Sequence, residues 1–188
     1  MCGIVGYIGS SNAIDIILNG LETLEYRGYD SSGIAFLDNN KIDVVKTVGR
    51  ISNLREKLES EYKNKISNIG VGHTRWATHG IPSNENSHPH LSMNSKFAVV
   101  HNGIIENYLL LKEELLKKNF VFKSETDTEV IPQLLEDLDD GDFLSTVFKM
   151  RNKVKGSYAF GILRQDTNEL IGTRKESPLV VGIGKDGF

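Results

Sequence analysis

The only cysteine of the chain, Cys2, lies one residue from the start of a 188-residue sequence. If Met1 is removed, the Cys2 thiol and a free α-amine stand on adjacent carbons. An α-amine has a pKa of about 7.7–8.0 and a free thiol about 8.5, so the amine can accept the thiol proton near neutral pH and later return it to a leaving group. The position therefore predicts a nucleophile–base unit. A small buried filler is the alternative that position alone leaves open.

All five histidines lie between residues 73 and 101, a stretch that also holds the only tryptophan, Trp76. The pair His88 and His90 has a spacing plausible for metal ligands. No second cysteine, HExxH motif or matching carboxylate accompanies the pair, so we expect no metal. The other interpretation is that these histidines bond to backbone groups in a long irregular segment, where functional residues often sit.

Two glycine-containing segments also raise the question of function. RGYDSSG, residues 27–33, is typical of a helix that ends at Gly28 and continues into a turn. The same geometry would deliver Arg27 to a sheet end, so a functional role for this arginine stays open. GIVGYIG, residues 3–9, lacks G-x-G-x-x-G spacing and a preceding strand, so we do not expect a dinucleotide site there.

Composition restricts the class of protein. The chain is 39% hydrophobic and 25% charged, as in soluble globular proteins, and one large domain or part of a slightly larger one fits its length. The net charge of −3 gives no reason to expect nucleic acid as a partner. No apolar run is long enough for a membrane span and no signal peptide is recognisable, so we expect a cytoplasmic protein without membrane contact.

Local patterns predict the elements that must position these residues. Apolar residues at helical spacing predict helices over residues 12–25, 51–62, 105–118 and 142–154. Short apolar runs predict strands over residues 3–9, 68–76 and 97–103, and a closing antiparallel meander over 157–164, 168–174 and 179–184. Mixed helices and short strands of this kind favour a layered α+β domain.

Two local signals refine this prediction. Residues 33–47 are typical of a hairpin, with Asn39 and Asn40 able to adopt left-handed turn geometry. Thr126 and Glu129 have the spacing of a capping box, which predicts that Asp127 lies in the first turn of a helix.

The motifs also occur in a recognisable order: Cys2 with GIVGYIG, then RGYDSSG, GHTRWATHG, NSHPH, VVHNGIIENY and SETDTEV. Together they resemble the glutaminase domain of the glutamine–fructose-6-phosphate aminotransferase family, which belongs to the class II amidotransferases and N-terminal-nucleophile hydrolases. The resemblance implies a four-layer αββα sandwich of antiparallel sheets. It also implies that residues 1–188 form a glutaminase domain that is incomplete at its C-terminal end, and that the sugar-phosphate isomerase/synthase domains are absent.

The resemblance implies a mechanism that agrees with the chemistry of an N-terminal cysteine. Cys2 would attack the side-chain amide of L-glutamine, release ammonia and leave a γ-glutamyl thioester for water to resolve. Asn102 and the Gly103 backbone N–H would supply the oxyanion donors. We expect glycine at 103 because a backbone without a Cβ can approach the substrate closely. Since the chain supplies every one of these groups, no cofactor is expected.

Substrate contacts follow from the same resemblance. Arg75 would bind the α-carboxylate of glutamine and Asp127 the α-ammonium group. Thr78 and His79 match positions that contribute further substrate contacts.

The segment HTRWATHGIP, residues 73–82, resembles a flexible loop that closes over glutamine and excludes water. Within it, Trp76 matches an indole that gates ammonia transfer, and Arg27 is expected to support the site.

The acceptor of the ammonia is a separate question. The resemblance implies delivery to a sugar-phosphate isomerase/synthase domain that converts fructose 6-phosphate to glucosamine 6-phosphate in a homo-oligomeric full-length enzyme. The alternatives are the glutaminase of an amidophosphoribosyltransferase-like enzyme, or a catalytically silent glutamine-binding module if Met1 is retained.

Overall fold

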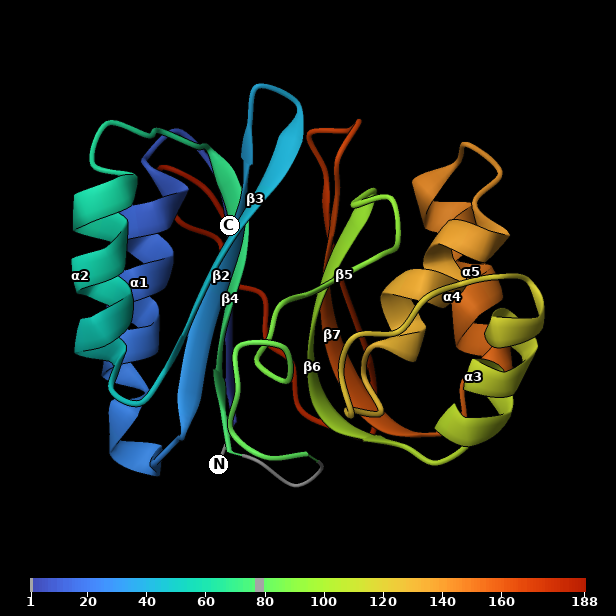
Figure 1. Cartoon of the computed structure of the whole chain (residues 1–188). Coiled ribbons are helices and arrows are strands. Elements are labelled where there is room, and N and C mark those ends of the chain that lie inside the picture. The colour runs from blue at the N-terminus through green and yellow to red at the C-terminus, as the bar shows by residue number, and fades with distance from the viewer. Residues whose placement is uncertain (1, 77–79) are drawn as a thin grey trace.

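The computed structural model describes residues 2–76 and 80–188. Two four-stranded antiparallel sheets face each other, and helices cover both outer faces (Figure 1). The first sheet has the strand order β1-β4-β2-β3. Its strands are β1 (Gly3–Ile8), β2 (Ser31–Asp38), β3 (Lys41–Val48) and β4 (Ile69–Arg75). Its outer face is covered by α1 (Ala13–Thr23) and α2 (Ile51–Glu61), and a short 3₁₀ helix, η1 (Glu25–Arg27), follows α1.

The second sheet has the strand order β5-β6-β7-β8. Its strands are β5 (His90–Leu91), β6 (Phe97–Ile105), β7 (Gly156–Arg164) and β8 (Leu170–Lys175). On its outer side lie α3 (Tyr108–Lys117), α4 (Val130–Leu138) and α5 (Phe143–Lys153) (Figure 1). The predicted four-layer αββα sandwich is therefore confirmed.

Three hydrophobic clusters hold the layers together. Between the sheets, the cluster includes small and β-branched side chains such as Ala35, Ala98, Val71 and Val100. Small side chains at facing positions let the two sheets approach closely and pack without voids. Larger residues fill the two helix–sheet layers, and burying each one stabilises the fold by about 1.5–3 kcal/mol.

Most predicted elements are present. The hairpin turns where expected, with φ angles of 49° at Asn39 and 60° at Asn40. The four helices predicted from apolar spacing are present, although the third begins at Tyr108 rather than residue 105. The two-residue strand β5 was not predicted, because so short a segment has no readable period. In the described part of the chain, none of the helices has both the length and the apolar character needed to cross a bilayer.

The predicted capping box at Thr126 is wrong. The helix α4 begins at Val130, with Glu129 as its N-cap residue, so Asp127 lies in the turn before the helix. The Glu129 carboxylate does not bond back to Thr126; it accepts hydrogen bonds from the backbone N–H groups of Lys123 and Ser124, at 2.6–3.1 Å. The capping box does not form because these N–H groups already occupy the Glu129 carboxylate.

The third strand of the predicted meander, at residues 179–184, is also absent. Its apolar side chains are exposed: Val180 is 89% exposed and Ile183 is 84% exposed. No strand among the described residues pairs with this segment, and without a ladder partner an apolar run cannot form a strand. The chain returns to the first sheet only at Gly187, which bridges to Gly9.

Candidate active site

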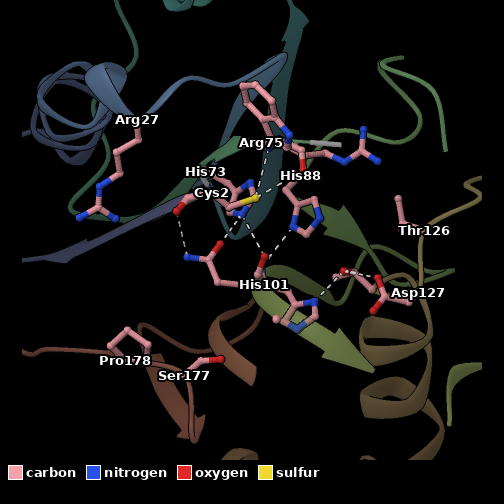
Figure 2. Close-up of a pocket in the computed structure, with 14 residues that line it drawn as sticks. Cys2, Arg27, His73, Arg75, His88, His101, Thr126, Asp127, Ser177 and Pro178 are labelled. Atoms are coloured by element: carbon pink, nitrogen blue, oxygen red, sulfur yellow. Dashed lines mark hydrogen bonds between the residues drawn. The ribbon is translucent and has the colours of Figure 1, made fainter. Parts of the chain in front are cut away.

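A cavity of about 650 Å³ is lined by residues from both sheets and from the segments that follow them. Seven of the nine predicted site residues line this one cavity: Cys2, Arg27, Arg75, Trp76, Asn102, Gly103 and Asp127. The other two, Thr78 and His79, lie outside the described residues. In Figure 2, Cys2 lies between Arg27 on one side and Thr126 and Asp127 on the other.

The first sheet holds Cys2 in place. The antiparallel pairing of β1 with β4 sets Gly3 opposite Thr74, so the residue before Gly3 stands beside the end of β4. The Cys2 sulfur accepts a hydrogen bond from the Trp76 N–H at 3.2 Å, and the Cys2 carbonyl accepts one from the Asn102 amide at 3.4 Å. Cys2 is thus bonded through its sulfur to the residue that follows β4 and through its carbonyl to β6 of the second sheet.

Asn102 and Gly103 are consecutive residues of β6. Gly103 has a φ of +133°, and a Cβ there would stand 2.0 Å from the Ser157 carbonyl oxygen of β7. The glycine is therefore required by the neighbouring strand. The prediction had assigned it to close approach of the substrate, which is a different reason.

Arg75 and Asp127 bring opposite charges to the cavity from buried positions. The Arg75 guanidinium donates to the Gly80 carbonyl at 3.3 Å and lies 3.9 Å from the Asp30 carboxylate. The Asp127 carboxylate accepts a hydrogen bond from the Ile105 N–H at 2.7 Å. A guanidinium and a carboxylate held in this way can bind the two charged groups of an amino acid.

Arg27 and Trp76 lie at the edge of the cavity. Gly28 ends η1 with a φ of +74°, which agrees with the predicted turn. A Cβ at Gly28 would stand 2.9 Å from the Trp76 ring, so the indole packs directly over this glycine. Trp76 as a whole remains 54% exposed, so it can contact both a bound molecule and solvent.

Seven further residues line the cavity that were not assigned to the site from sequence: His73, His88, His101, Thr126, Thr128, Ser177 and Pro178. Clustering of the histidines was the available signal for three of them. The serine and proline lie after β8 in a segment whose sequence resembles an ordinary turn, so no signal marked them.

The histidines of the cavity are neutral and bonded to protein groups. Burial lowers the pKa of His73 to about 4 and that of His101 to about 3. The His101 ring is 2.8 Å from the Thr128 hydroxyl, and that hydroxyl donates to the Asp127 carboxylate at 3.4 Å. Among residues 2–76 and 80–188, no three His, Cys, Asp or Glu side chains are grouped so as to hold a metal ion.

A family model described as a glutamine amidotransferase domain matches residues 73–187, more than half of the chain. The chain belongs to this family. The predicted family and the predicted enzyme class, a glutamine amidotransferase, are confirmed.

Relatives of this amidotransferase domain agree with the assignment. The chain is 55% identical over 185 residues to "Glutamine--fructose-6-phosphate aminotransferase [isomerizing]" of Caldanaerobacter subterraneus subsp. tengcongensis, covering 98% of this chain and 30% of the relative. The protein of the same name from Clostridium perfringens is 54% identical over 190 residues, covering 100% of this chain and 31% of the relative. The chain thus spans about 30% of the length of these relatives.

Solved structures show the same fold. Glutamine phosphoribosylpyrophosphate amidotransferase from B. subtilis, complexed with ADP and GMP, superposes with a TM-score of 0.74 at 28% identity, covering 88% of this chain and 35% of that chain. A class II glutamine aminotransferase domain protein from Silicibacter pomeroyi has a TM-score of 0.56 at 15% identity, covering 96% of this chain and 79% of that chain, which is evidence for the fold alone.

Proposed function

We propose that this amidotransferase domain hydrolyses L-glutamine to glutamate and ammonia, with Cys2 as the nucleophile. One observation carries the proposal: the only cysteine shares a single cavity with an amide donor, Asn102, a buried cation, Arg75, and a buried carboxylate, Asp127. These are the groups needed to attack an amide, stabilise its oxyanion and hold a zwitterion.

Glutamine binds with its zwitterionic end at two charged side chains and with its side-chain amide at Cys2. Its α-carboxylate pairs with the Arg75 guanidinium and its α-ammonium group with Asp127. Because Asp127 stands to one side of Cys2 in Figure 2, the side chain of glutamine extends from there toward the sulfur. Thr78 and His79 add contacts from the loop that closes over the substrate.

The reaction proceeds in two steps once Met1 has been removed. The Cys2 α-amine takes the thiol proton, and the sulfur forms a bond to the amide carbon of glutamine. The resulting oxyanion accepts hydrogen bonds from the Asn102 amide and the Gly103 N–H. The carbon–nitrogen bond then breaks, and the α-amine returns the proton to the departing ammonia. Water adds to the thioester carbon, which releases glutamate and regenerates the thiol.

The ammonia serves a sugar-phosphate isomerase/synthase domain that converts fructose 6-phosphate to glucosamine 6-phosphate. In this proposal residues 1–188 act as the glutaminase domain of such an enzyme. The names of relatives more than 50% identical support this acceptor over phosphoribosylpyrophosphate, which occurs in the name of a structural neighbour only 28% identical. Trp76, half-exposed at the cavity, gates the ammonia, and Arg27 supports the site.

Intact mass and glutamate release test the proposal together. The intact mass of the purified protein is measured before and after incubation with diazo-oxonorleucine, an electrophilic glutamine analogue. Glutamate release from L-glutamine is measured on the same preparation without the analogue. We expect loss of Met1, one adduct per chain and steady glutamate release. In Cys2→Ala the adduct and the glutamate release should both be abolished. A chain that lacks Met1 yet binds glutamine without an adduct or glutamate release is instead a silent binding module.

A further inference from the structure

Four buried histidines form a continuous group at the cavity, three of them lining it, and the proposed mechanism uses none of them. They are His73 on β4, His88, His90 on β5 and His101 on β6. The His73 and His88 rings stack with centroids 4.2 Å apart and an interplanar angle of 16°, and His90 meets His88 edge-on at 4.7 Å. Of these, His73 is the ring that contacts a proposed catalytic side chain.

The contacts of His73 determine which ring nitrogen carries its proton. Its Nε2 is 2.9 Å from the His101 backbone carbonyl and 2.9 Å from the Asn102 Oδ1. A backbone carbonyl oxygen can only accept a hydrogen bond, so Nε2 must be the protonated nitrogen. Burial lowers the pKa of His73 to about 4, so the ring holds this single proton near neutral pH.

The protonated Nε2 in turn determines the orientation of the Asn102 amide. A nitrogen that already carries hydrogen in a neutral imidazole cannot accept a bond from an amide N–H. The amide atom facing His73 is therefore the oxygen, and the Nδ2 group points the other way, where it donates to the Cys2 carbonyl at 3.4 Å. Among the described residues, these are the only partners of the Asn102 side chain.

We infer that His73 is a positioning residue for glutamine hydrolysis, which holds the Asn102 amide so that its N–H, and not its oxygen, faces the oxyanion. This inference rests on the proposed function. In the reversed orientation the amide oxygen would face a developing negative charge and repel it. The arrangement is rigid, because His88 stacks on His73 and is itself fixed by accepting the His101 N–H at 3.2 Å.

Three substitutions, and one combination of two of them, test the inference. His73→Phe keeps a flat ring that can stack on His88 but has no N–H to donate. His73→Gln keeps an amide N–H near the position of Nε2. Asn102→Ala removes the group through which His73 is inferred to act. Each is prepared with Met1 removed, verified by intact mass, and compared with the unsubstituted chain for glutamate release.

For His73→Phe we expect kcat to fall by about tenfold to a hundredfold, less than the about 10²–10³-fold loss for Asn102→Ala, with KM changed less than about threefold. His73→Gln should recover most of the lost kcat. In the Asn102→Ala background, His73→Phe should cost nothing more, because its effect passes through the missing amide. Alkylation of Cys2 by iodoacetamide, a displacement that forms no oxyanion, should keep its rate in the two His73 variants.

The contrary results are distinct. An equal loss in both backgrounds, no recovery by His73→Gln, or unchanged kcat in His73→Phe would overturn the inference. If His73→Phe does not fold by circular dichroism, His73→Asn, whose amide reaches the Nδ1 position instead, takes its place in the same comparison. If the unsubstituted chain without Met1 releases no glutamate, the proposed function itself fails, before any variant is compared.

Discussion

At the scale of single residues, the buried histidines link the stability of the fold to pH. Burial lowers the pKa values of His73 and His101 to about 4 and about 3, and those of His88 and His90 well below their usual 6.5. In the unfolded chain each histidine binds a proton near pH 6.5, whereas in the folded chain it does not. Between pH 6.5 and about 4 the unfolded state thus binds more protons, so acid favours unfolding.

We predict that the free energy of unfolding falls as the pH drops below 6.5, by up to about 1.4 kcal/mol per pH unit for each of these histidines. Urea denaturation at pH 7.5, 6.0 and 5.0 measures the slope. His90→Gln is the matched variant, because an amide can still bond to Thr126, which His90 meets at 3.1 Å. Its slope should be shallower by one histidine's share, and an unchanged slope would contradict the assignment.

At the scale of elements, the pairing of β6 with β7 depends on glycine at the cavity. Gly103 combines a φ of +133° with a Cβ position 2.0 Å from the Ser157 oxygen, whereas Gly141 has a φ of +95° with nothing within 4 Å. Gly141→Ala therefore measures the cost of backbone conformation alone, about 1–2 kcal/mol. Gly103→Ala adds a backbone clash, so we predict a loss of unfolding free energy at least twice as large, by urea denaturation. If the two variants lose equal free energies of unfolding, β6 and β7 can move apart at this position without cost and the prediction is wrong.

The elements also show how far local patterns extend. Apolar spacing located four of the five α-helices in the described part of the chain and most strands, because each buries one face against the rest of the fold. Local patterns failed where the outcome depends on a partner outside the pattern itself. Glu129 is engaged by the segment before it, so the expected capping box does not form. Residues 179–184 have the apolar character of a strand but no neighbour to pair with in the described chain.

The candidate site likewise has residues that could be predicted from the sequence and a contact that only the structure shows. Its position marked Cys2 and the family resemblance marked Arg75, Asn102 and Asp127, and the structure places all four at one cavity. No pattern along the chain could indicate that a ring on β4 fixes the amide of Asn102 on β6. That relation requires the two sheets to face each other, which only the tertiary structure supplies.

At the scale of the whole molecule, the sandwich brings the last residues of the chain back to its beginning. Ile8 and Phe188 exchange backbone hydrogen bonds at 2.9 and 3.1 Å, and the Tyr7 hydroxyl donates to the Asp186 carbonyl at 2.8 Å. These contacts anchor the end of a segment whose middle is apolar and exposed. Val180, Val181 and Ile183 are 89%, 72% and 84% exposed.

An apolar run with unpaired backbone groups can pair with another chain. We therefore predict that this 188-residue chain self-associates as its concentration rises, and that replacing both Val181 and Ile183 by lysine suppresses the association. Ile66→Lys is the control, because Ile66 is 80% exposed but lies elsewhere, before β4. Sedimentation velocity over a concentration series measures the effect. Glutamate release per chain should stay the same, since neither substituted residue lines the cavity. If the double variant associates as strongly as the unsubstituted chain, the prediction is wrong and the contact lies on another surface.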